Sequence, residues 1–118
     1  MTTWPQPFDL AATLTCGQCF RWKRNADGSF SGVAGGRMLT VSPQSPGDAL
    51  GDPFWRRYFD LESDYAAICA GLAAQSPVLA AALAETPGVR ILRQDPWEAL
   101  CTFILSQNNN IPRITGIV

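Results

Sequence analysis

Residues 16–42 read CGQCFRWKRNADGSFSGVAGGRMLTVS, and this run decides the fold because short apolar stretches alternate in it with turn-forming residues. The turns are an Asn-Ala-Asp-Gly segment at 25–28 and a Gly-Gly pair at 35–36. The pair suits a two-residue hairpin, since both glycines can take a positive φ. We therefore predict an antiparallel meander. Its expected strands are Phe8–Leu14, Cys19–Lys23, Phe30–Ala34 and Arg37–Ser42.

After a connector at 43–51, the spacing of apolar residues changes to the helical period. Asp52 followed by Pro53 is typical of a helix start, and the aromatic residues that follow are expected in the core rather than on a stacking surface. These aromatic residues are Phe54, Trp55, Tyr58 and Phe59. Two more helices are predicted, one over 65–72 behind a Ser63 or Asp64 cap, and one over 78–83 that ends at 86–88.

The strongest helix signal starts at Asp95, which precedes Pro96 and stands three residues before Glu98 in a capping-box arrangement. This helix is predicted to run to about residue 107, and it is apolar on nearly every side, as expected of a helix enclosed by a larger body. An asparagine triplet ends it, and a further apolar element begins at residue 111 without a closing cap. We expect an α+β chain that is truncated: a twisted antiparallel sheet domain with flanking helices over 1–90, then the start of an all-helical domain over 91–118.

Composition and charge exclude several classes of function. The 118 residues include 9 basic and 10 acidic side chains, a net charge of −1, so any nucleic-acid surface must be local. The sequence has no histidine, which removes Ser-His and Cys-His nucleophiles and the commonest metal ligand. No run approaches the length of a membrane span, and the amino terminus lacks a signal-peptide pattern. We expect an intracellular monomer with no cofactor, no metal and no membrane partner.

Four cysteines are too few for a small disulfide scaffold, which fits a reducing compartment. Cys16 and Cys19 form a C-x-x-C motif, but redox use needs the first thiol at a helix amino terminus, and a strand-like segment follows here. Cys69 and Cys101 form no second close pair, as a zinc site would need. A turn between two small residues is favoured, and thiol–disulfide chemistry remains an alternative.

Three features could carry recognition chemistry, and each also has a plain structural interpretation. The triplet Asn108–Asn110 could be a helix cap and turn, or its amides could read base edges together with the bidentate donor Arg113. Gly17 could be a simple turn residue, or it could let a ligand approach its main-chain carbonyl. Phe103 is more often a core residue than a base-stacking one.

Two segments together resemble one family. The residues Gly17–Trp22 and Phe30–Val33 resemble the amino-terminal signature of the 8-oxoguanine DNA glycosylases. The residues Gly88–Pro96 and Phe103–Gly116 resemble that family's entry into its helix-hairpin-helix domain, apart from Pro112, which replaces a small helical residue. The resemblance runs in the right order from about residue 8 to residue 118.

The resemblance implies base-excision repair: recognition and excision of 8-oxoguanine opposite cytosine in double-stranded DNA, with base flipping and an associated strand-cleaving lyase activity. It implies a lesion pocket at the Gly17 carbonyl and Phe103, and contact of Asn108, Asn109 and Arg113 with the orphaned cytosine.

The catalytic lysine and aspartate of the family lie beyond the asparagine triplet, so the resemblance assigns no catalytic residue here, and Lys23, the only lysine, matches no catalytic position. We expect the 118 residues alone to be inactive. The alternative is a non-catalytic DNA- or protein-binding module.

Overall fold

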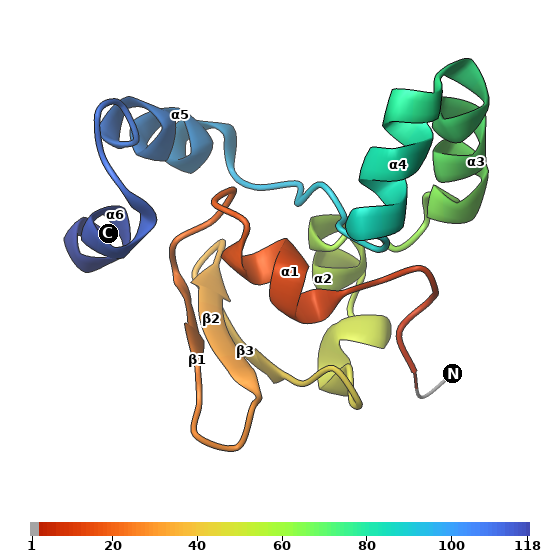
Figure 1. Ribbon diagram of the computed structural model, residues 1–118. Helices are drawn as coiled ribbons and strands as arrows, with labels where there is room; N and C mark the ends of the chain where they lie inside the picture. The colour runs from red at the N-terminus through yellow and green to blue at the C-terminus, as the bar shows by residue number, and fades with distance from the viewer. Residues whose placement is uncertain (1–2) are drawn as a thin grey trace.

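The computed structural model describes residues 3–118, and Figure 1 shows a small sheet with helices on both sides. In chain order the elements are α1 (Leu10–Thr15), β1 (Trp22–Arg24), β2 (Phe30–Ala34), β3 (Arg37–Val41), the 3-10 helix η1 (Gly47–Leu50), α2 (Pro53–Tyr58), α3 (Tyr65–Gln75), α4 (Pro77–Glu85), α5 (Pro96–Leu105) and α6 (Ile111–Ile117). The α+β class is confirmed. The division at residue 90 stays a prediction.

The sheet is an antiparallel meander in the order β1-β2-β3, as predicted. The hairpin between β2 and β3 turns at Gly35 and Gly36, whose φ values are +57° and +71°. Trp22 on β1 pairs with Gly32 on β2, and a Cβ atom on Gly32 would lie 2.2 Å from the Trp22 ring. Glycine at position 32 therefore makes room for the indole in the core.

The predicted strand over Phe8–Leu14 is wrong, because this segment contains helix α1. The Asp9 side chain caps that helix by accepting a hydrogen bond of 2.9 Å from the Ala12 amide. The buried residues Leu10, Thr13 and Leu14 then follow helical spacing, although Phe8, Leu10 and Leu14 also fit an alternating pattern. The strand predicted from Cys19 begins only at Trp22, because residues 16–21 form a loop held by side-chain contacts.

The predicted helix starts after the sheet are confirmed by their caps. The side chains of Asp52, Asp64, Ser76 and Asp95 each accept a hydrogen bond from a backbone amide in the first turn of the helix that follows. Proline stands at the first helical position after three of these caps, where its missing N–H costs no hydrogen bond. The connector at 43–51 contains the short helix η1, which the sequence did not predict.

An aromatic cluster forms the core beneath the sheet. Trp55, Tyr58 and Phe59 of the aromatic stripe are buried, as predicted, and Trp22 donates a hydrogen bond of 2.9 Å from its indole Nε1 to the Tyr58 hydroxyl. Phe54 is only half-buried, and the Arg37 guanidinium lies 4.8 Å from its ring centroid. The stripe is therefore mainly core.

Arg90 is almost fully buried, with 1% of its surface exposed, between the amino-terminal segment and the loop that joins α2 to α3. Its guanidinium donates hydrogen bonds to the carbonyls of Asp60 (2.8 Å), Ser63 (3.3 Å) and Pro5 (3.2 Å). It also stacks over the Tyr65 ring at 4.3 Å. Burial lowers the pKa of Arg90, because desolvation penalises the charged form.

Asp60 completes this cluster from a strained position, since its φ is +53°. Burial alone would raise the pKa of its carboxyl group, but hydrogen bonds from Tyr65, Ser63 and Arg93 outweigh that effect and lower it. The carboxylate therefore stays charged and holds α3 and the 90–93 segment together.

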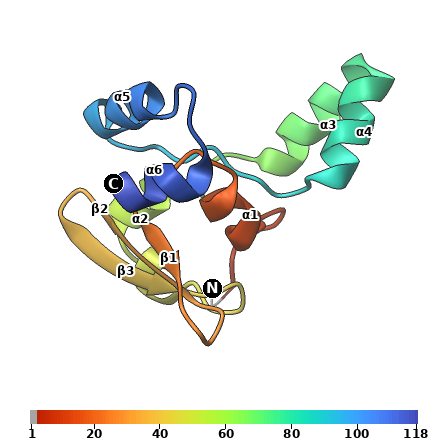
Figure 2. The ribbon, with the colours of Figure 1, turned by 60° about the vertical axis from the view of Figure 1, so that its left-hand side comes forward.

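Two helical pairs project from this core on opposite sides. Figures 1 and 2 both show the α3–α4 hairpin well separated from α5 and α6. Helix α5 is largely unpartnered: Trp97, Phe103 and Ile104 are each at least 60% exposed. Within residues 3–118 no helix is long and apolar enough to cross a membrane.

We predict that Arg90→Met lowers the free energy of unfolding by about 3 kcal/mol, because it leaves the Pro5 and Asp60 carbonyls without donors. Urea denaturation followed by tryptophan fluorescence measures the change. The matched control is Arg57→Met, because Arg57 is exposed and forms no ion pair among the described residues, and we expect a change within about 0.5 kcal/mol. Equal losses in the two variants would contradict the role of Arg90.

Candidate nucleic-acid interface

The loop between α1 and β1 turns sharply at Gly17. This residue has a φ of +97°, a conformation that side-chain-bearing residues rarely adopt. Within residues 3–118 its carbonyl accepts no hydrogen bond, although neighbouring carbonyls at Thr13 and Gln18 do. The Gly17 carbonyl is therefore an acceptor available to a ligand.

Gln18 anchors this loop to the segment that leads into α5. Its Nε2 atom donates hydrogen bonds to the carbonyls of Thr13 (3.0 Å) and Arg90 (2.8 Å), and its Oε1 atom accepts one from the Leu92 amide (3.0 Å). The Gln18 carbonyl in turn accepts a hydrogen bond from the Gln94 side chain. Residues 16–18 and 90–94 are thus held together, although more than 70 positions separate them.

The turn between α5 and α6 uses the three asparagines in different ways. Asn109 donates to the Leu105 carbonyl at 3.0 Å, and Asn110 accepts from the Arg113 amide at 3.0 Å as the cap of α6. Asn108 takes a left-handed conformation, with φ of +52°. The cap-and-turn interpretation is therefore confirmed for the triplet, yet the exposed Asn108 side chain forms no hydrogen bond among the described residues.

The loop and this turn meet at one contact. A Cβ atom built on Gly17 would lie 3.4 Å from Cδ1 of Ile111, the first residue of α6. Two segments that carry the recognition motifs are therefore neighbours. Arg113, two residues further on, is exposed and has no ion pair in the part of the chain that the structure describes.

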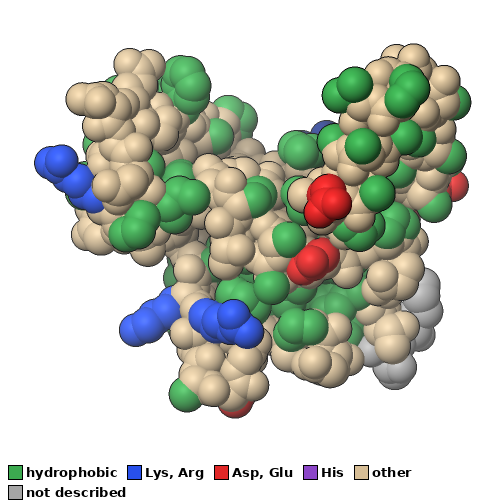
Figure 3. All heavy atoms as spheres, viewed as in Figure 1, with side chains coloured by type: hydrophobic (Ala, Val, Ile, Leu, Met, Phe, Trp, Pro, Cys, Tyr) green, Lys and Arg blue, Asp and Glu red, His purple; other side chains and the backbone are tan. Residues whose placement is uncertain are grey.

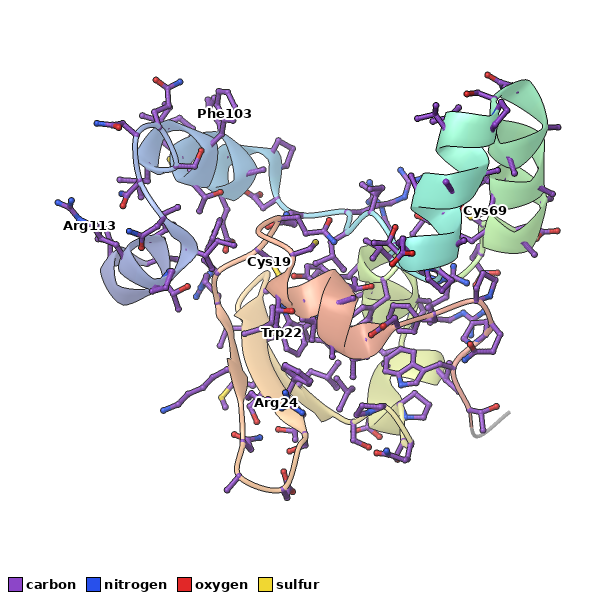
Figure 4. The ribbon with its side chains drawn as sticks, in the orientation of Figure 1. Cys19, Trp22, Arg24, Cys69, Phe103 and Arg113 are labelled. Carbon is purple, nitrogen blue, oxygen red and sulfur yellow. The ribbon has the colours of Figure 1, made fainter. Side chains whose placement is uncertain are left out.

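Phe103 is placed differently. Its side chain is 62% exposed, so its interpretation as a core residue is wrong. Figure 4 shows it on the side of α5 that points away from Cys19 and the α1–β1 loop. A ring in this position is free to contact another molecule, but the structure does not bring it against Gly17.

Exposed basic side chains lie at two separate places on the face that Figure 3 shows, and Figure 4 labels Arg24 by the sheet and Arg113 by α6. Lys23, Arg24 and Arg113 are exposed and form no ion pairs within residues 3–118, whereas Arg21 pairs with Glu98 of α5 at 3.3 Å. These three side chains are therefore free to contact phosphate groups.

The two cysteines of the C-x-x-C motif lie on either side of Gly17 and Gln18. Cys16 is exposed and Cys19 is buried, and both are free thiols. Burial, with smaller contributions from Cys16 and Glu98, raises the pKa of the Cys19 thiol to about 12. Because redox and metal chemistry use the thiolate, this environment argues against both. Among the described residues, no three metal-ligating side chains gather into a site.

A cavity of about 240 Å³ lies between α2, the β2–β3 hairpin and residues 93–98. Its lining includes Phe54, Arg57 and Arg93, and none of the candidate recognition residues Gly17, Phe103, Asn108, Asn109 and Arg113. This cavity is therefore separate from the Gly17 loop and the asparagine turn.

The model of the family described as 8-oxoguanine DNA glycosylase, N-terminal domain, matches residues 2–52 and 51–100 of this sequence. The chain belongs to this family. Similar proteins are named as N-glycosylases and DNA lyases, in agreement with the family that the sequence motifs resemble.

Similar proteins support the assignment. The N-glycosylase/DNA lyase OGG1 of Arabidopsis thaliana is 32% identical over 127 residues, which cover 92% of this chain and 33% of that protein. The structure of MBOgg1 in complex with a low-affinity DNA ligand has a TM-score of 0.77 and 43% identity. The 8-oxoguanine glycosylase/lyase of Clostridium acetobutylicum, in complex with double-stranded DNA containing cytosine opposite 8-oxoguanine, has a TM-score of 0.78 and 37% identity. These two comparisons cover 92% of this chain and 39% of each solved chain.

The chain thus spans about a third of the length of the Arabidopsis relative. The recognition motifs and their order were predicted from the sequence, but the anchors Gln18 and Gln94 were missed. Glutamines separated by 76 positions give no local signal of a contact, since only the fold brings them together.

We predict that iodoacetamide at about pH 8 modifies Cys16 in the folded protein and leaves Cys19 unmodified. Cys19 is buried, and a pKa near 12 keeps almost all of its thiol protonated at that pH. Mass spectrometry after timed quenching measures the modification of each residue. In urea both cysteines should react; comparable rates in the folded protein would contradict the assigned environment of Cys19.

Proposed function

We propose that this chain recognises 8-oxoguanine opposite cytosine in DNA and contributes to its excision in base-excision repair. The observation that carries the proposal is the contact between Gly17 and Ile111, which makes the α1–β1 loop and the asparagine turn neighbours. Membership of the glycosylase family and the likeness to the Clostridium acetobutylicum enzyme bound to DNA support it.

The lesion is distinguished by one hydrogen atom. 8-Oxoguanine carries a hydrogen on an imidazole nitrogen where guanine has a lone pair, so a main-chain acceptor favours the lesion. The Gly17 carbonyl is the acceptor in this proposal, because it has no partner within residues 3–118. Guanine would place its lone pair against that carbonyl, at a cost of about 1–3 kcal/mol. We include Phe103 as an exposed ring that contributes to the same binding surface.

The opposite base is read by the turn and by α6. A cytosine left unpaired after base flipping offers one amino donor and ring and carbonyl acceptors. The Arg113 guanidinium supplies donors for the acceptors, and the Asn108 amide supplies both an acceptor and donors. Asn109 contributes by fixing the turn, because its side chain is bonded to the Leu105 carbonyl.

We further propose that residues 1–118 bind the substrate without supplying the nucleophile. Lys23, the only lysine, lies on exposed β1 rather than in a desolvated pocket, where nucleophilic lysines are usually found. Excision and lyase chemistry are then activities of the complete family fold. The proposal also places the chain inside the cell as a monomer, in the cytoplasm or nucleoid of a bacterium or the nucleus of a eukaryote, where its DNA substrate lies.

We predict that the 118-residue chain binds a duplex with 8-oxoguanine opposite cytosine more tightly than the undamaged duplex, and that borohydride traps no covalent adduct. Fluorescence anisotropy measures binding, and denaturing gels detect an adduct. Equal affinity for the two duplexes would contradict lesion recognition. An adduct that is lost in Lys23→Ala would instead show that this chain carries its own nucleophile.

We predict that Asn108→Ala and Arg113→Ala each reduce the preference for cytosine opposite the lesion by about tenfold, because each removes hydrogen bonds to a buried base. The affinities for the lesion opposite each of the four bases measure this preference. Gln107→Ala is the neighbouring control, since it is exposed and should leave the preference unchanged. A loss of equal size for all four opposite bases would assign the two residues to backbone contact instead.

A further inference from the structure

The Gln18 side chain uses both of its donor hydrogens and its carbonyl oxygen within the protein. Two carbonyls, those of Thr13 and Arg90, face its Nε2 atom, and one amide, that of Leu92, faces its Oε1 atom. An amide has two donor hydrogens and one carbonyl, so these three partners fit only one orientation of the group. Rotation of the amide by a half turn would place like groups together. The Gln18 side chain is therefore fixed in direction as well as in place.

The main chain of Gln18 is held at a second point. Its carbonyl accepts a hydrogen bond from the Gln94 side chain, at the end of the segment that leads into α5. Fixing both the side chain and the carbonyl of Gln18 fixes the substituents of its Cα atom, and with them the nitrogen end of the planar Gly17–Gln18 peptide, so this peptide can reorient only by rotation about the bonds at its two ends. The Ile111 side chain lies next to Gly17, 3.4 Å from a Cβ atom built on it.

The alternative orientation of this peptide would reverse its chemistry. A flip of the Gly17–Gln18 peptide replaces the carbonyl, which is unpartnered among the described residues, by the Gln18 N–H group, and glycine at position 17 tolerates such flips more readily than other residues. Within residues 3–118 the Gln18 N–H group forms no hydrogen bond that would oppose the flip. A donor in this position would match the lone pair of guanine instead of the hydrogen of 8-oxoguanine.

We propose that Gln18 and Gln94 are positioning residues that hold the Gly17–Gln18 peptide with its carbonyl toward the base. They thereby set the preference for 8-oxoguanine over guanine. This inference rests on the proposed function, and it assigns the preference to two glutamines that need not touch DNA. The same hydrogen bonds link the loop to residues 90–94, so the direction of the carbonyl depends on the position of that segment.

Gln18→Met tests the inference, because methionine has a similar length and no amide group. We expect the ratio of affinities for 8-oxoguanine and guanine duplexes, each with cytosine opposite, to fall at least about fivefold. Much of the change should come from tighter binding of the guanine duplex. Gln94→Met removes one hydrogen bond only and should give a smaller loss in the same direction, which keeps the test valid if Gln18→Met does not fold. Gln44→Met, at an exposed position in the connector, is the matched control.

A purely structural role would give a different result. If the glutamines only stabilise the fold, both affinities should fall together and their ratio should stay constant, which would overturn the inference. Thermal unfolding of each variant, followed by circular dichroism, establishes that the proteins compared are folded.

Measurements on the free chain separate this inference from the proposed function. NMR relaxation dispersion at the Gln18 amide nitrogen should show no exchange in the wild type and exchange in Gln18→Met, and the Leu92 amide should lose protection from hydrogen exchange in the variant. If the wild-type chain does not distinguish the two duplexes, but Gln18→Met still shows these changes, the proposed function is refuted and the positioning role stands. A Gln18→Met chain without exchange at this peptide would refute the positioning role.

Discussion

The buried guanidinium of Arg90 is the interaction on which the arrangement of this chain depends. A cation without water needs several acceptors, and here they come from the carbonyls of Pro5, Asp60 and Ser63. These carbonyls belong to segments far apart in the sequence, so the hydrogen bonds of one guanidinium group hold the amino-terminal segment against the α2–α3 loop. The Arg90 main chain extends the effect, because its amide donates to Thr13 and its carbonyl accepts from Gln18. The core and the recognition loop therefore share one anchor.

Local signals were sufficient for most of the fold. The helix caps at Asp52 and Asp95 and the glycine pair at 35–36 act within four or five residues, so the sequence alone predicted them. Helix α1 was missed because the spacing of Phe8, Leu10 and Leu14 fits a strand as well as a helix. The Asp9 cap decides between them in favour of the helix.

The candidate site was predicted less completely than the fold. Gly17, Asn108 and Arg113 were found because they stand in motifs, and the structure places their segments side by side through Ile111. Gln18 and Gln94 act through contacts that exist only after folding, so no spacing indicated them. The error at Phe103 has a similar cause. An apolar residue in a helix is expected to be buried, and its exposure here follows from the arrangement of its neighbours in space, which the sequence does not show.

The contact between Gly17 and Ile111 has a consequence for how specificity can change. Gly17, on one side of it, carries the carbonyl proposed to bind the lesion. Ile111, on the other side, is the first residue of α6, which also carries Arg113, the residue proposed to bind the cytosine. A larger or smaller side chain at position 111 would alter the packing between the two segments, so we expect a substitution there to change both readings, whereas substitutions at the base-reading residues change one reading each.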